Sequence, residues 1–198
     1  AKARRTIQQI DLPHIDPRRR VLGIIRPTAE VIGSLTQSRH VGVLATEGTI
    51  KSESYTLEIK KLFPDITVSG VACPFWVPLV EYNEADSPGA DYFVKKRIDQ
   101  LMAADPQIDA IILGCTHYPL LMPKIKKYAP AHVRIIAQGD FVAGSLQDYF
   151  SRHPEMEQAC SKRGTVRYLT TENPNKFRES AQLFLHEHVE VETTTLGT

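Results

Sequence analysis

The residues best suited to chemistry are Cys115, Thr116 and His117, which directly follow an apolar run ending at Gly114. Pro119 comes next, and proline is well suited to the first turn of a helix. A strand that leads through a turn into a helix is where open α/β folds place their reactive groups. The helix start and the adjacent imidazole both favour a thiolate, which can attack an electrophile or accept a proton.

The alternative for this turn is purely structural. A lone cysteine is often a small buried hydrophobic residue, and His117 would then only make structural hydrogen bonds. Cys73 stands before Pro74 in an apolar stretch, where we expect a structural role, and we assign no role to Cys160. The three cysteines lack metal-ligand spacing, so we expect neither a disulfide framework nor a metal site.

A second candidate turn carries two hydroxyls. Thr46 and Thr49 lie between an apolar strand at 41–45 and a helix. The free N–H groups of a helix start, with the threonine hydroxyls, can bind a small carboxylate. The alternative is that Thr49 or Ser52 only caps the helix. Glu81 ends another apolar segment, and the sequence leaves open whether it faces solvent or a pocket.

The composition excludes several classes of protein. The chain has 198 residues, of which 42% are hydrophobic and 24% charged, as in globular proteins. A net charge of +1 leaves no electrostatic footprint for nucleic acid or an anionic membrane. No apolar run approaches the roughly 18 residues of a membrane span, and no signal peptide is visible. With sparse cysteines, this predicts a cytoplasmic protein that binds neither nucleic acid nor membrane.

Apolar runs alternate with amphipathic segments along the chain. Strands are predicted at 21–25, 41–45, 66–72, 108–113, 133–137, 166–169 and 189–191. Helices are predicted at 1–10, 27–35, 52–63, 90–104, 119–128, 141–150 and 174–185, with irregular connections at 73–81 and 153–164. Near-continuous apolar strands are typical of parallel sheets covered on both faces. The pattern therefore predicts an α/β fold with a doubly wound, mostly parallel sheet and helices on both faces.

Four segments resemble bacterial glutamate racemases. GCTHYPLL at 114–121 resembles the second cysteine motif of that family. GIIRP at 23–27, GVLATEGTIKS at 42–52 and ACPFWVPLVE at 72–81 agree in order and spacing. The resemblance covers 1–139 well and the tail more loosely. Aspartate racemases of the same superfamily tend to carry glutamate where this chain has His117.

The resemblance implies cofactor-independent proton transfer between L- and D-glutamate, for peptidoglycan synthesis. Two thiols would flank the substrate α-carbon, because its weakly acidic proton needs a base and an acid aligned on opposite faces. Cys115 would be one of these thiols, and His117 would assist it. Glu81 would support them without contacting the substrate. The residues that the resemblance places around the substrate are Thr46, Thr49, Thr116 and His117.

The departures from the family are equally informative. Its Asp-Ser motif, its Tyr-Gly pair and its first cysteine turn, Ala-Cys-Asn-Thr, do not occur in this sequence. We therefore expect a chain that lacks the partner thiol and much of the first of two family domains, and is inactive alone. Residues 1–20 would be a remnant helix and linker of that domain, 21–138 the second racemase domain, and 139–198 the segment that completes the first.

Two other functions stay open on the sequence. One is a non-catalytic α/β module that binds a carboxylate or regulates a partner. The other is a racemase of the same superfamily that acts on aspartate or a hydantoin. His117 favours glutamate, by resemblance only, and the resemblance also allows a homodimer.

Overall fold

The computed structural model describes residues 6–16, 19, 21–162 and 164–195. The chain forms two compact units, Ala1–Tyr149 and Phe150–Thr198. The boundary falls within helix α9 (Gly139–Arg152). Each unit is described by itself.

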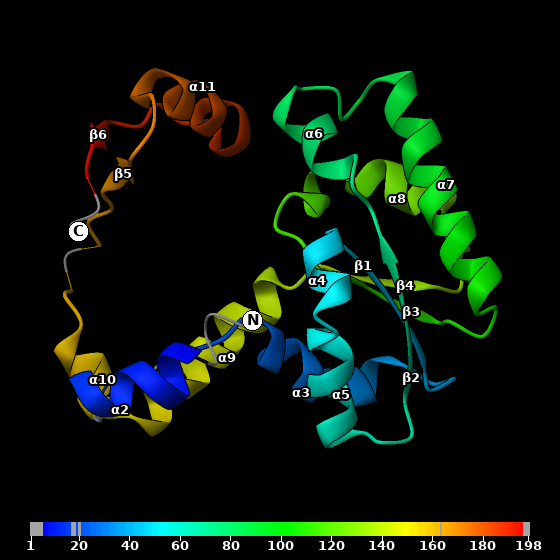
Figure 1. The fold of residues 1–198 in the computed structure, drawn as a ribbon, viewed down its shortest axis with the longest axis horizontal. Helices are drawn as coiled ribbons and strands as arrows, with labels where there is room; N and C mark the ends of the chain where they lie inside the picture. The colour runs from blue at the N-terminus through cyan, green and yellow to red at the C-terminus, as the bar shows by residue number, and fades with distance from the viewer. Residues whose placement is uncertain (1–5, 17–18, 20, 163, 196–198) are drawn as a thin grey trace. The chain divides into compact units, whose positions relative to one another are not determined.

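The first unit is built on a parallel sheet of four strands in the order β2-β1-β3-β4 (Figure 1). Its strands are β1 (His40–Ala45), β2 (Thr67–Ala72), β3 (Ala110–Leu113) and β4 (Arg134–Ile136). The chain leaves β1 toward β2 on one side and returns to β3 and then β4 on the other. The point where the connections diverge therefore lies between β1 and β3, which is where such sheets bind ligands.

Helices cover both faces of this sheet, with α3 and α5 on one side and α7 and α8 on the other (Figure 1). The long helices are α3 (Ile25–Leu35), α5 (Ser54–Leu62), α7 (Pro88–Ala104) and α8 (Met122–Tyr128). The shorter ones are η1 (Ile7–Asp11), α2 (Leu12–Ile15), α4 (Glu47–Lys51), α6 (Trp76–Glu81) and η2 (Tyr118–Leu121). The predicted mostly parallel α/β fold is confirmed.

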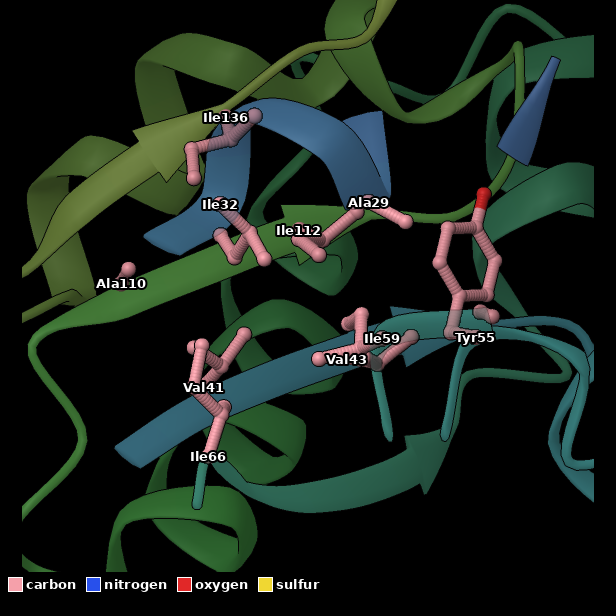
Figure 2. Close-up of a cluster of buried hydrophobic side chains, with 11 residues drawn as sticks. Ala29, Ile32, Val41, Val43, Tyr55, Ile59, Ile66, Ala110, Ile112 and Ile136 are labelled. Carbon is pink, nitrogen blue, oxygen red and sulfur yellow. The ribbon is translucent and has the colours of Figure 1, made fainter. Parts of the chain in front are cut away.

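The core explains why the strands are apolar throughout. Every second residue of β1, starting at Val41, joins a buried cluster with Ile32 of α3 and Ile59 of α5; Figure 2 shows this cluster, with Tyr55 at one end. The intervening Gly42 faces α7, where an added Cβ would lie 2.6 Å from Leu101 Cδ2. Because helices cover both faces, neither side of the strand carries a polar row.

The predicted strand at 21–25 is wrong. Ile25 begins α3, and among the described residues no strand pairs with residues 21–24. Leu22 and Ile24 are each 53% exposed. An apolar run forms a strand only where a neighbouring strand accepts its hydrogen bonds, and neither edge strand of this sheet, β2 or β4, pairs with residues 21–24.

Three other segments differ from the prediction. The segment 73–81, expected to be irregular, contains α6, because Pro78 lies in the first turn, where no N–H partner is needed. The predicted helix 52–63 is preceded by α4 and begins at Ser54, after Glu53 with its φ of 50°. The segment 119–128 begins as the 3₁₀ turn η2 before α8. Of the predicted helix 1–10, residues 1–5 lie outside the described part.

The second unit is small. Its elements are α10 (Pro154–Ala159), β5 (Tyr168–Thr170), α11 (Pro174–Leu185) and β6 (Val191–Thr193). The two strands pair in parallel, each about two residues later than predicted, and the predicted excursion at 153–164 contains α10. Among its described residues the only buried hydrophobic side chains are Ala181 and Val189, whereas Val166, Leu169 and Leu185 are exposed.

One carboxylate ties the α3–β1 connection to the start of β3. Asp109 accepts a hydrogen bond from Thr36 Oγ1 at 2.5 Å and from the backbone N–H groups of Gln37 and Ser38 at 2.7 and 2.8 Å. Burial raises the pKa of Asp109, but these hydrogen bonds outweigh it and lower the pKa to about 2. The folded chain therefore holds this group ionised.

We predict that Asp109→Asn lowers the free energy of unfolding at pH 7 by about 1–3 kcal/mol, because it weakens three hydrogen bonds to a charged acceptor. The pKa is depressed on folding, so this stabilisation is fully present above about pH 4 and is lost as the pH falls toward 2. Urea denaturation at pH 7 and pH 3, with the exposed Asp86→Asn as control, should show a smaller difference at pH 3. An equal difference at both pH values would contradict the assignment.

Candidate active site

The carboxyl ends of the four parallel strands bring four residues to one edge of the sheet. Thr46 follows β1, Cys73 follows β2, Cys115 lies two residues after β3, and Gln138 lies two residues after β4. The register pairs Ala45 with Ala72, Leu44 with Leu113 and Ile112 with Ile136, so the four strands end within one residue of each other at this edge. Thr46 and Cys115 flank the point where the connections diverge, as the sequence predicts.

Cys115, His117 and Glu81 form a continuous line. The sulfur of Cys115 lies 3.8 Å from Nδ1 of His117, and Nε2 of the same ring lies 2.6 Å from Oε1 of Glu81. The side chains of His117 and Glu81 are 28% and 39% exposed, so Glu81 reaches the site and still contacts solvent. A carboxylate in this position orients the imidazole and fixes which ring nitrogen faces the sulfur, which places that nitrogen for proton exchange with the thiol.

Gly114 lets this turn lie close to the core. A Cβ added there would stand 2.9 Å from Ala45 Cβ and 3.1 Å from Tyr55 Cε2. Its N–H donates to the carbonyl of Leu44 at 2.8 Å. Glycine is required here because the backbone after β3 passes directly against the end of β1 and the tyrosine ring.

Cys73 shares the sheet edge but not the chemistry. Tyr118, itself fully buried, donates its hydroxyl to the carbonyl of Cys73 at 3.2 Å and packs edge-on against Trp76 with ring centroids 4.8 Å apart. Cys73 is 1% exposed, and burial raises the pKa of its thiol to about 12. It therefore stays a protonated structural residue.

The two predicted threonines contact each other. Thr46 Oγ1 and Thr49 Oγ1 lie 3.1 Å apart, and both residues are half-buried. Thr46 takes the N-cap position of α4 but makes no side-chain capping bond, and Ser52, at the other end of α4, donates to the carbonyl of Thr49 at 2.8 Å. Neither hydroxyl therefore caps α4, and each keeps hydrogen-bonding capacity beyond their mutual contact. Thr116 is exposed on the Cys115 turn.

Sequence reasoning missed Gln138, which ties three elements together behind this turn. Its Nε2 donates to the carbonyl of Leu113 at 3.0 Å. Its Oε1 accepts from the hydroxyls of Tyr55 at 2.9 Å and Thr28 at 3.2 Å. The signal was available, because Gln138 follows a predicted strand just as Thr46 and Cys115 do.

Two further features bear on the class of site. Within the described ranges, no group of three or more histidine, cysteine, aspartate or glutamate side chains is placed to hold a metal ion. No helix in that same part of the chain is both long and apolar enough to cross a bilayer. Cys160 is exposed and belongs to the second unit.

We predict that iodoacetamide at pH 8 modifies Cys115 and Cys160 but spares Cys73. A thiol with a pKa of about 12 is ionised to only about one part in 10⁴ at pH 8, and Cys73 is also buried. Peptide mass mapping of the folded chain checks the pattern, and the same reaction in urea should label all three cysteines. Labelling of Cys73 in the folded chain at the rate of Cys160 would contradict the structure.

Comparisons with known proteins agree with this geometry. Residues 20–144 match the family model described as Asp/Glu/Hydantoin racemase. Glutamate racemase of Shouchella clausii is 36% identical over 182 residues, which is 92% of this chain and 62% of the relative. Glutamate racemase of Streptococcus agalactiae is 33% identical over 192 residues, covering 96% and 68%. The chain thus spans about two thirds of the length of these relatives.

Solved structures show the same likeness. Glutamate racemase isoform RacE1 of Bacillus anthracis superposes with a TM-score of 0.82 at 27% identity, covering 96% of this chain and 70% of that one. The Francisella tularensis enzyme, solved in complex with D-glutamate, gives a TM-score of 0.79 at 26% identity, covering 93% and 67%. From the matched segment and these identities, the chain belongs to the Asp/Glu/hydantoin racemase family.

Proposed function

We propose that this chain carries one side of a glutamate racemase site, in which Cys115 exchanges a proton with the substrate α-carbon. The observation that carries the proposal is the line from Cys115 through His117 to Glu81, next to the hydroxyl pair of Thr46 and Thr49. Glutamate is the proposed substrate because the relatives are named glutamate racemases and one was solved with D-glutamate.

The proposed inversion transfers one proton from the substrate to Cys115 and takes one proton from a second acid. The thiolate of Cys115 takes the α-proton, so that the C–H bond breaks, an S–H bond forms and the electron pair stays on the substrate. A proton delivered to the opposite face then gives the other enantiomer. The α-carboxylate would be held by Thr46, Thr49 and Thr116, whose hydrogen bonds would stabilise the developing charge. His117, oriented by Glu81, would interconvert the thiol and thiolate forms of Cys115.

Inversion needs a second acid on the far side of the α-carbon. Of the other cysteines in these 198 residues, Cys73 is buried and protonated, and Cys160 belongs to the second unit. We propose that neither supplies the second proton, and that the chain alone does not racemise glutamate. A single thiol can still return a proton to the face from which it took one.

We propose a matching domain organisation. A parallel sheet is normally covered on both faces, and two strands alone are marginally stable. The second unit has two parallel strands and several exposed apolar side chains. This supports the proposal that residues 139–198 and residues 1–20 are parts of another domain, and that residues 21–138 form the domain with Cys115. A homodimer and a cytoplasmic location belong to the same proposal, on the family resemblance.

The substrate assignment is tested by calorimetry with L-glutamate, D-glutamate and D-aspartate. We expect stereospecific binding of glutamate, and a weakening of about tenfold in Thr46→Val, which removes one hydrogen bond to a charged ligand. Thr171→Val, an exposed threonine of the second unit, is the matched control and should bind like the unaltered chain. Absence of stereospecific binding would favour a non-catalytic module, and preference for aspartate would favour the other substrate class.

The role of Cys115 is tested by proton exchange in heavy water. We expect the 198-residue chain to replace the α-proton of one glutamate enantiomer by deuterium without forming the other. The exchange should fall by roughly 10²–10⁴-fold in Cys115→Ser, because the acid–base group is lost. NMR follows the α-proton and circular dichroism follows inversion. Exchange that survives in Cys115→Ser, or racemisation at normal enzymic rates, would contradict the proposal.

A further inference from the structure

We infer that Gln138 is a positioning residue for the Cys115 turn, an inference that rests on the function proposed above. The geometry points to a side-chain amide that fixes the backbone just before the thiol and so sets where the sulfur stands relative to His117. Gln138 is far from Cys115 in the sequence. It follows β4 and reaches the end of β3 only through its side chain.

The side-chain amide of Gln138 makes a hydrogen bond that the β3–β4 pairing does not provide. The pairing of β3 with β4 ends at Ile112 and Ile136, so the carbonyl of Leu113 lies beyond the ladder. Gln138 Nε2 donates to that carbonyl at 3.0 Å. On the other side, the next N–H, that of Gly114, donates to Leu44 of β1 at 2.8 Å. The backbone that leads into Cys115 is therefore held from both neighbouring strands, by main chain on one side and by Gln138 on the other.

Two buried hydroxyls fix the orientation of the amide itself. Oε1 accepts from Tyr55, which is 4% exposed, and from Thr28, which is 0% exposed. Burial raises the pKa of Tyr55 to about 12, so its hydroxyl keeps the proton that it donates. The carbonyl of Leu113 can only accept, so the NH₂ group of Gln138 must face it, and Oε1 then faces the two hydroxyls that donate to it.

The same tyrosine also supports the turn by packing. Its Cε2 lies 3.1 Å from where a Cβ of Gly114 would stand. Gln138, Tyr55 and Thr28 thus join β4, α5 and α3 to the two residues that precede Cys115. Loss of the amide leaves a carbonyl and two hydroxyls without partners, and the turn gains freedom to shift. A shift near 1 Å is enough to separate reacting groups from their productive geometry.

A double-mutant cycle on thiol reactivity tests this role. The measured quantity is the rate of Cys115 alkylation by iodoacetamide, divided by that of Cys160 in the same molecule, from pH 6 to 9. In the unaltered chain, His117→Ala should lower this ratio by about tenfold, because it removes the ring nitrogen 3.8 Å from the sulfur that can accept the thiol proton during the reaction. In a Gln138→Leu background the same change should lower it by less than about threefold, because the two groups are no longer aligned.

The controls separate positioning from stability. Asp109→Asn destabilises the same unit at the opposite end of the sheet and should leave the full tenfold effect of His117→Ala. Tyr55→Phe removes one hydroxyl without opening a cavity. It should reduce the effect of His117→Ala, as Gln138→Leu does, and it serves as the test variant if Gln138→Leu does not fold. Circular dichroism checks folding of each variant.

The outcomes distinguish this inference from the proposed function. An equal effect of His117→Ala with and without Gln138 overturns the positioning role and leaves the pair of Cys115 and His117 standing. An effect below about twofold in the unaltered chain contradicts that pair, and the positioning role falls with it.

Discussion

The pairing of β1 with β3 is the constraint on which the site depends. Its register places Leu44 opposite Leu113, so the two turns that follow begin side by side. The close approach of Gly114 to Ala45 leaves no room for a side chain between them. An added Cβ at Gly42 would lie 2.6 Å from Leu101 and one at Gly114 would lie 2.9 Å from Ala45, so a slip of register would push larger side chains into these close contacts. The hydrophobic core therefore fixes the distance between the thiol turn and the hydroxyl turn.

Much of this arrangement follows from the sequence, because apolar strands in an alternating pattern give a parallel sheet and polar residues at their ends share an edge. That rule identifies Thr46 and Cys115 and applies equally to Gln138. It fails for the contact of His117 with Glu81, which are 36 residues apart. That contact depends on α6, which ends at Glu81. Two prolines in a short segment suggest an irregular connection, but Pro74 lies before α6 and Pro78 lies in its first turn, where proline is tolerated.

The strand prediction at 21–25 fails for a related reason. An apolar run of this length has the composition of a strand, but hydrogen bonds to a neighbour decide whether it forms one. Val191 shows the opposite case, since it pairs with Tyr168 although its surroundings are largely polar. Local composition therefore marks segments that are able to form a strand, while long-range pairing decides which of them do. Polar networks such as that of Gln138 depend on the same long-range contacts and are correspondingly hard to foresee.

Cys73 and Cys115 show how far environment outweighs position. Both follow strands of the same sheet at the same edge, and a strand-end rule treats them alike. Cys73 is 1% exposed and its carbonyl accepts a hydrogen bond from the buried Tyr118, and burial raises the pKa of its thiol to about 12. Cys115 stands partly exposed, 3.8 Å from an imidazole that a carboxylate orients. Burial disfavours the thiolate of Cys73, whereas the turn after β3 leaves the sulfur of Cys115 partly exposed beside a ring nitrogen, so the segment that follows each strand decides which thiol is accessible.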